Sequence, residues 1–338
     1  MKPLFSFLCR TLIAGITVVS ALAQAQSTVN QADSRVRVVG WIPAYGVEKS
    51  REALNADPAI VHGLTRIGLQ FWNPSADGKS LVFAPVDESG KLVTETQVRE
   101  IVAWAKERKI QVMLTVYNNS QVMKKWDWAL ARRAFADHPK QFASALIEEV
   151  KKYDLDGIDL DLEGEGHLDA DRKAYAAFVG SLSRQLKRQG KFLTVDSFHS
   201  PCVNAPNMSW WPDWRGKVDA IHSMGYQDLY EGSVATFTPE SGQICENGAA
   251  MFKYSWQLKY GLQAGYQKHQ IVMGFPTWLD SWGDGDQVAQ GGIGTGVLDH
   301  IEEAKKLGVG MALWDLQLAA PKWRQAETWK AIQALRKH

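Results

Sequence analysis

The stretch Asp156-Gly157-Ile158-Asp159-Leu160-Asp161-Leu162-Glu163 carries the strongest structural signal in the chain. Side chains alternate between the two faces of a β-strand, so Asp159, Asp161 and Glu163 share one face and three aliphatic residues share the other. The aliphatic face suits packing against helices, which directs the acids toward the inside of a closed sheet. Carboxylates held this close share protons and titrate as a coupled group.

Three interpretations of the acids imply different chemistry. Neighbouring carboxylates can keep one member protonated near neutral pH, where it serves as a general acid. Alternating oxygens can instead bind a divalent cation, although no histidine nearby is an obvious ligand. A solvated face on an edge strand is the third interpretation, and the apolar opposite face argues against it. The first accounts best for Glu163, because this residue ends the strand where a substrate would arrive.

Short β-branched apolar runs alternate with helical patterns along the chain. Eight strands that alternate with helices predict an α/β fold with a parallel sheet, and eight is the number that closes a (β/α)8 TIM barrel. An open doubly wound sheet is the alternative, but no glycine-rich phosphate loop follows the first strand. The predicted strands cover residues 36–42, 65–72, 110–117, 155–163, 192–198, 218–226, 271–278 and 310–315. The predicted helices cover residues 95–108, 127–152, 169–189, 249–267, 297–307 and 323–336.

The start of the chain has the layout of a secretory signal peptide. A short basic segment precedes an apolar run at residues 12–23, and small residues follow around Ala23 and Ala25. We therefore expect a signal peptide at residues 1–25 and export to the periplasm or the cell exterior. The run is short for a membrane span, and we expect no span in the mature chain.

The remaining residues, 26–338, are predicted to form one barrel domain. The chain has 338 residues, and a barrel of this type typically needs about 250. A hairpin insertion is predicted after the second strand, at residues 75–93, with turns at Asp77-Gly78 and Ser89-Gly90. No linker or low-complexity tract suggests a second domain.

The composition narrows the function classes. The chain carries 38 Lys and Arg against 37 Asp and Glu, so we expect no nucleic acid as a partner. A charged fraction of 22% beside 45% hydrophobic residues argues against disorder. The 14 tryptophans are many for this length. Since indole faces stack on sugar rings, they favour a carbohydrate-binding cleft.

Two cysteines remain once the predicted signal peptide is removed. They are Cys202 and Cys245. An oxidising compartment favours a disulfide between them, and two unpaired buried thiols are the alternative.

The acid motif resembles the signature of family-18 glycoside hydrolases, the chitinase family. That signature is Asp-x-x-Asp-x-Asp-x-Glu, and all four acids are present here. Four further segments are similar to elements of the family. They are Val39-Gly40-Trp41 on the first strand, Met224-Gly225-Tyr226 on the sixth, Met273-Gly274-Phe275-Pro276 on the seventh and Trp314 on the last.

The resemblance implies a secreted retaining glycosidase that cleaves β-1,4-linked N-acetylglucosamine glycans. The substrate's own acetamido carbonyl would attack the anomeric carbon and form an oxazolinium ion. Glu163 would be the general acid and base, and Asp161 would orient the acetamido group and stabilise the positive charge. Asp159 would tune Asp161 by sharing a proton, and Tyr226 would donate to the acetamido carbonyl.

The resemblance also implies a set of sugar contacts and structural residues. Trp314 would form the floor beneath the sugar, and Asp156 and Gly157 would complete the motif as structural residues. No metal and no cofactor are implied, and we expect a monomer whose partner is an N-acetylglucosamine-containing oligo- or polysaccharide. Further substrate contacts are expected at the C-terminal ends of the predicted strands, where barrel enzymes carry their chemistry. They are Met224, Gln227, Trp41, Tyr117, Asn118 and Trp278.

Two departures from the family's pattern leave the substrate open. The third strand ends Thr115-Val116-Tyr117-Asn118-Asn119 instead of Ser-x-Gly-Gly, and Gln227 stands where Asp or Asn is usual. Chitin, N-glycans cut by an endo-β-N-acetylglucosaminidase, and peptidoglycan all remain candidates. A non-catalytic sugar-binding barrel is the alternative of another class, and the presence of Glu163 argues against it.

Five other tryptophans follow predicted strands. Trp210, Trp211 and Trp214 suit a sugar platform and the packing of a short helix equally well. Trp126 and Trp128 follow the third strand and suit a subsite wall.

Overall fold

The computed structural model describes residues 36–83, 93–120, 125–201, 203–226, 254–279 and 296–336. The predicted signal peptide, Cys202, Cys245 and Gln227 lie outside these residues and stay predictions. Among the described residues, no helix is long and apolar enough to cross a membrane.

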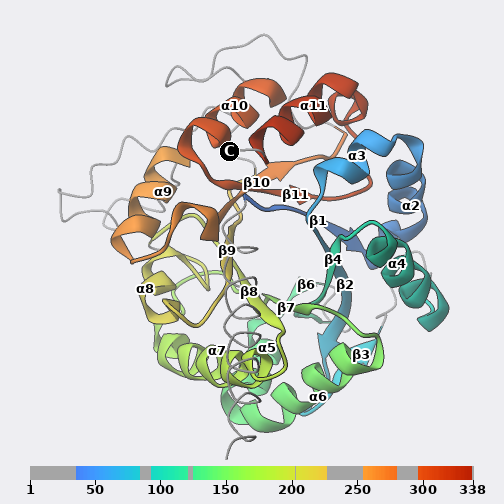
Figure 1. The fold of residues 1–338 in the computed structure, drawn as a ribbon. Coiled ribbons are helices and arrows are strands. Elements are labelled where there is room, and N and C mark those ends of the chain that lie inside the picture. Colours follow the sequence, from blue (N-terminus) through green and yellow to red (C-terminus); the bar gives the residue numbers. More distant parts are fainter. Residues whose placement is uncertain are drawn as a thin grey trace, which may run out of the picture. The chain divides into compact units, whose positions relative to one another are not determined.

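Eight parallel strands form a closed barrel with helices around it (Figure 1). Their order is β1-β11-β10-β9-β8-β7-β4-β2, and β1 also pairs with β2, which closes the ring. The (β/α)8 TIM barrel is therefore confirmed, and the open doubly wound sheet is excluded. The strands are β1 (Val38–Pro43), β2 (Arg66–Pro74), β4 (Gln111–Tyr117), β7 (Gly157–Asp161), β8 (Phe192–Ser197), β9 (Ala220–Ser223), β10 (Ile271–Pro276) and β11 (Gly310–Trp314).

The helices Val47–Ala56 and Pro58–Gly63 were not predicted, and one predicted helix is divided by a proline. The single helix predicted at residues 127–152 is wrong, because Pro139 lacks an N–H and begins a new helix after a π-helical turn. Asp57 caps the short helix that begins at Pro58, because its side chain accepts from Ala59 N. The helices are α2 (Val47–Ala56), α3 (Pro58–Gly63), α4 (Glu95–Glu107), α5 (Trp128–Arg132), α6 (Pro139–Lys152), α7 (Arg172–Lys187), α8 (Trp211–Trp214), α9 (Tyr254–Gln263), α10 (Val297–Leu307) and α11 (Ala326–Leu335).

A hairpin follows β2, as predicted. Strand β3 (Leu81–Phe83) runs antiparallel to the end of β2, with Trp72 opposite Phe83. The turn between them includes Gly78 at a φ of 73°, a conformation that favours glycine. The second half of the predicted insertion lies outside the described residues. A second small sheet pairs β5 (Asn119–Ser120) with β6 (Lys125–Trp126).

The apolar core has two parts that set the direction of the acids. Ile158, Leu160 and Leu162 belong to the outer core between the strands and the helices. A smaller apolar cluster fills the barrel interior and includes Trp41 and Phe192. The alternation along β7 therefore points its acids inward, above this inner cluster, as the sequence predicted.

Three tryptophans of the loop after β8 are packing residues. Trp210, Trp211 and Trp214 are fully buried, and all three belong to the outer core. Trp211 also donates from Nε1 to Ser197 Oγ over 2.7 Å. They therefore anchor α8 to the barrel wall and offer no face to a sugar.

Candidate active site

Asp159 lies at the centre of the barrel among hydrogen-bond donors from four strands. Trp41 Nε1 and Thr115 Oγ1 donate to Asp159 Oδ2 over 2.9 and 3.1 Å. Thr194 Oγ1 donates to Oδ1 over 2.5 Å, and His222 Nδ1 lies 3.1 Å from the same oxygen. This carboxyl is fully buried, so the donors replace the water that it has lost.

Glycines on the strands make room for this arrangement. A Cβ on Gly68 would lie 2.4 Å from Trp41 Cδ1, so only glycine lets the indole reach Asp159. A Cβ on Gly157 would lie 2.4 Å from the Phe192 ring. The first acid of the motif joins two strands, because Val112 N donates to Asp156 Oδ2 over 2.8 Å. These positions have the structural role that the motif implied.

Asp161 and Glu163 form a hydrogen-bonded pair one level higher. Gln70 Nε2 donates to Asp161 Oδ2 over 2.8 Å, and Asp161 is 3% exposed. Strand β7 ends at Asp161, so Glu163 lies just beyond it and is half-buried. The pair thus stands at the C-terminal end of the strand, the end that carries the chemistry in barrels of this kind.

The backbone of Glu163 is held from two sides. Asn118 Nδ2 donates to Glu163 O, and Glu163 N donates to Asn118 Oδ1, each over 2.7 Å. The next residue, Gly164, exchanges backbone hydrogen bonds with Ala205, which precedes a cis proline. The catalytic candidate is therefore fixed by its main chain, which leaves the carboxyl to face the cavity.

The pKa values of the acids diverge along the stack. Burial and the charge of Asp159 raise the pKa of Asp161 to about 7. Burial and Asp161 raise the pKa of Glu163 well above its usual range. Burial also opposes the charge on Asp159, but His222 and the hydrogen bonds from Thr194 and Trp41 hold its pKa below the ordinary value. These directions favour a carboxylate at Asp159, deep in the barrel, and protons on Asp161 and Glu163, closer to the cavity.

Two members of the site were missed in the sequence. Asp196 on β8 and His222 on β9 are at most 3% exposed, and His222 Nδ1 lies 2.8 Å from Asp196 Oδ1. Burial and the surrounding acids raise the pKa of Asp196 well above its usual range. A signal did exist, because Asp196 follows Thr194 with the same two-residue alternation that marks the acids on β7.

A cavity of about 480 Å³ opens above the acids. Tyr226 and Trp278 meet edge to face across 6.4 Å, and burial raises the pKa of Tyr226, which keeps its hydroxyl a donor. The peptide bond after Trp314 is cis. The lining residues are Trp126, Asp161, Glu163, Asp196, Phe198, His199, Asn204, Met224, Tyr226, Trp278 and Trp314.

The structure sorts the predicted sugar contacts into three groups. Trp314, Met224 and Trp278 line the cavity, as does Trp126. Trp41 and Asn118 are buried beneath it, where they hold Asp159 and the Glu163 backbone, so their side chains are not cavity walls. Tyr117 is half-buried and packs against Trp126 at 6.1 Å. Trp128 packs against Phe135 and donates to Asp171, so it is a packing residue.

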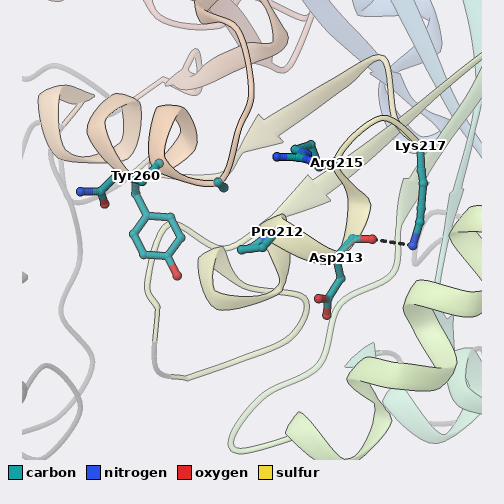
Figure 2. Close-up of a pocket in the computed structure, with 7 residues that line it drawn as sticks. Pro212, Asp213, Arg215, Lys217 and Tyr260 are labelled. Carbon is teal, nitrogen blue, oxygen red and sulfur yellow. Dashed lines mark hydrogen bonds between the residues drawn. The ribbon is translucent and has the colours of Figure 1, made fainter.

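A second cavity, of about 600 Å³, lies beside α8 and α9. Figure 2 shows the labelled side chains around it, with Lys217 donating to the main-chain oxygen of Asp213. Arg172 Nε pairs with the Asp213 carboxylate over 2.6 Å. The only acid in this lining is thus already neutralised, and the strand-end cavity is the better candidate because it holds the protonated acids.

Three groups come close enough to be considered as metal ligands. Ligand atoms of Asp159, Asp196 and His222 lie within 4.8 Å of one another. They face each other at hydrogen-bond distances, and Thr194 donates to the same Asp159 oxygen that His222 approaches. This geometry favours a hydrogen-bonded cluster, since donors point at the oxygens that an ion would need.

The raised pKa of Asp161 predicts a pH-dependent stability. Its pKa is about 7 in the folded protein against 3.8 ordinarily, so the unfolded chain releases this proton more readily. The free energy of unfolding should therefore fall as the pH rises from about 4 to about 7, by up to about 4 kcal/mol. Urea unfolding of the wild type and Asp161→Asn at each pH measures this. The variant should have a smaller slope than the wild type, and the slope that remains comes from Glu163 and Asp196, whose pKa values are also raised. Equal slopes would contradict the raised pKa.

Comparisons with known proteins place the chain in a family. The model of the family described as glycosyl hydrolases family 18 matches residues 37–333. Chitinase 1 of Tulipa saxatilis subsp. bakeri is 26% identical over 125 residues, which are 36% of this chain and 39% of that protein. The match thus spans about two fifths of that relative's length.

Solved structures share the fold at low sequence identity. A chitinase from Chromobacterium violaceum has a TM-score of 0.64 and 15% identity, over 89% of this chain and 98% of that one. A class V chitinase from Pseudomonas fluorescens has a TM-score of 0.64 and 17% identity, over 88% and 99%. The spore cortex-lytic enzyme SleL of Bacillus cereus has a TM-score of 0.63 and 15% identity, over 89% and 74%.

Proposed function

Since this chain belongs to glycosyl hydrolase family 18 and is a glycosidase, we propose that it cleaves β-1,4-linked N-acetylglucosamine chains, with chitin oligosaccharides as substrates. The observation that carries the proposal is the Asp161–Glu163 pair, two adjacent buried carboxyls with raised pKa values at the base of an aromatic-lined cavity. The chitinase names of the relatives support the choice of substrate. We also propose export, on the basis of residues 1–25.

The mechanism assigns one role to each group at the cavity floor. Glu163 donates its proton to the glycosidic oxygen, which lets the leaving sugar depart as a neutral alcohol. The acetamido carbonyl of the bound sugar attacks the anomeric carbon, and the oxazolinium ion forms. In the second half of the reaction, Glu163 returns the shared proton to Asp161 and takes a proton from water, which opens this ion with net retention of configuration.

Asp161 and Tyr226 preorganise the acetamido group. Asp161 accepts the acetamido N–H and passes its proton toward Glu163 as that residue becomes an anion. The charge left on Asp161 then stabilises the positive oxazolinium ring. The Tyr226 hydroxyl, which burial keeps protonated, donates to the acetamido oxygen and fixes its angle of attack. Trp314 gives the sugar ring an apolar floor.

A substrate panel tests the proposal. Wild-type protein is incubated with chitin oligosaccharides, chitobiose-core glycans and peptidoglycan, and the first anomer released is identified by proton NMR. We expect cleavage of the chitin oligosaccharides with the β-anomer formed first, and tight binding of a thiazoline that mimics the oxazolinium ion. A first product in the α-form, or no binding of the thiazoline, would remove the substrate-assisted mechanism.

The same panel separates the alternatives. Faster cleavage of peptidoglycan or of N-glycans than of chitin oligosaccharides would identify those glycans as the substrate and would leave the proposed mechanism unchanged. Binding of sugars without any cleavage would favour a non-catalytic barrel.

A further inference from the structure

We propose that Asp196 and His222 are positioning residues that hold Asp159 as a carboxylate and so keep the protons of the acid stack on Asp161 and Glu163. The inference rests on the proposed function. It concerns two buried side chains from strands β8 and β9, which the mechanism above does not use.

The three groups meet where three neighbouring strands face the barrel axis. His222 Nδ1 lies 3.1 Å from Asp159 Oδ1 and 2.8 Å from Asp196 Oδ1, and Asp196 also hydrogen-bonds Asp159. Trp41 packs its indole edge to face with the His222 ring at 5.1 Å and 84°, which fixes the ring plane. His222 Nε2 is buried and has no hydrogen-bond partner among the described residues, so the ring's polar contacts are made through Nδ1 alone.

The hydrogen bonds leave no site on Asp159 for a proton, which departs from the proton sharing between Asp159 and Asp161 that the family resemblance implied. A carboxylate offers about four lone-pair positions. On Asp159, Oδ2 receives Trp41 and Thr115, and Oδ1 receives Thr194. His222 and the carboxyl of Asp196 share the position that remains. A proton on either oxygen would displace one of these buried donors and leave it unsatisfied.

Asp161 points away from this crowded centre. Its hydrogen bonds go to Gln70 and to Glu163. The acids and the histidine that interact with Asp159 are Asp161 on β7, Asp196 on β8 and His222 on β9. Tyr175 and Tyr226 also interact with its charge, and burial raises the pKa of both hydroxyls, which keeps them neutral. The donors from β1 and β4 are an indole and a hydroxyl, neither of which titrates near neutral pH. The charge on Asp159 is therefore controlled by Asp196 and His222.

The consequence for catalysis is the location of a proton. A negative Asp159 favours a proton on Asp161, where it can pass to Glu163 once Glu163 has protonated the leaving group. If Asp159 takes up a proton instead, Asp161 loses this attraction and the relay is broken. The acidic limb of the pH profile of kcat/KM should then report the protonation of Asp159.

The variant His222→Asn tests the inference. Asparagine Nδ2 overlays the position of Nδ1, so one donor is kept but the side chain can no longer carry charge. We expect the acidic limb to move to higher pH by about one unit, because Asp159 loses the partner that holds its pKa down. At pH values below both limbs, kcat should be about tenfold lower than in the wild type, and KM should change little because His222 is not among the cavity-lining residues.

A matched control is His300→Asn on α10. His300 is 1% exposed and its Nδ1 lies 3.1 Å from Gly296 O, so the change costs packing without touching the acids. It should lower the unfolding temperature and leave the acidic limb in place. If the acidic limb lies at the same pH in the wild type and in both variants, the inference is overturned and His222 is a packing residue.

Asp196 provides a second pair of variants. Asp196→Asn keeps an acceptor for His222 and a donor for Asp159, so its pH profile should stay near that of the wild type. Asp196→Ala removes both, so its acidic limb should move to higher pH, as in His222→Asn. A wild-type profile in Asp196→Ala would also overturn the inference.

A readout without substrate separates this inference from the proposed function. Asp159 contributes stability that is lost as the pH falls through its lowered pKa, so His222→Asn should begin to lose stability at a higher pH than the wild type. That shift is measured by thermal unfolding even if no glycan is cleaved. Its absence would count against the role of His222, while an inactive wild type would count only against the proposed function.

Discussion

Replacement of Glu163 by glutamine is expected to lower kcat/KM on chitin oligosaccharides by about 10³-fold, which corresponds to about 4 kcal/mol in the barrier. Glutamine keeps the size of the side chain. The two hydrogen bonds from Asn118 hold the backbone of Glu163 and do not involve its carboxyl, so the replacement should not disturb them. The loss therefore comes from the missing proton, since an amide cannot protonate the glycosidic oxygen. KM should change little, because the sugar's stacking surfaces remain.

The matched control is Glu165→Gln, two residues further along the same loop. Glu165 is exposed, so neutralising it removes a similar charge without removing the acid that faces the cavity. We expect nearly wild-type rates for this control. Activity of Glu163→Gln within tenfold of the wild type on every glycan would mean that another group protonates the leaving sugar.

The fold followed from the sequence because its signals are local. The alternation along residues 156–163 predicted both the strand β7 and the inward direction of its acids, and the outer core contains the aliphatic set of that strand. The strand ends were less well predicted, since β9 stops at Ser223 before the Met-x-Tyr element. Pairing partners decide where a strand ends, and these are not visible in one segment.

The site was predicted only in part, because barrel closure decides which strand-end residues reach the cavity. Trp41 was expected to touch sugar, but Gly68 on the neighbouring strand lets its indole sink toward Asp159. Asp196 and His222 are 26 residues apart and come together because β8 and β9 pair in parallel register, with Asp196 opposite His222. The alternation on β8 marks Asp196 as inward-facing, but the charge relation to Asp159 needs the closed ring.

Replacement of Asp161 by asparagine is expected to lower kcat by about 10²-fold and to change KM much less. Asparagine can still accept the hydrogen bond from Gln70, so the side chain should keep its place. It cannot become negative as the oxazolinium ion forms, and it has no proton to pass to Glu163. Because both losses act in the transition state and not in substrate binding, they should appear in kcat.

The pH profile of Asp161→Asn distinguishes loss of charge from loss of shape. The carboxyl of Asp161 raises the pKa of Glu163 by its charge and by its hydrogen bond, after the larger effect of burial. Without that charge, Glu163 should lose its proton at lower pH, so the alkaline limb of kcat/KM should move to lower pH. Asp156→Asn, on the same motif but at the start of the strand, should leave the limb in place, because Asp156 contacts the backbone of β4 and not Glu163. An unmoved limb in Asp161→Asn would show that the two carboxyls titrate independently, and would contradict the shared proton on which the mechanism depends.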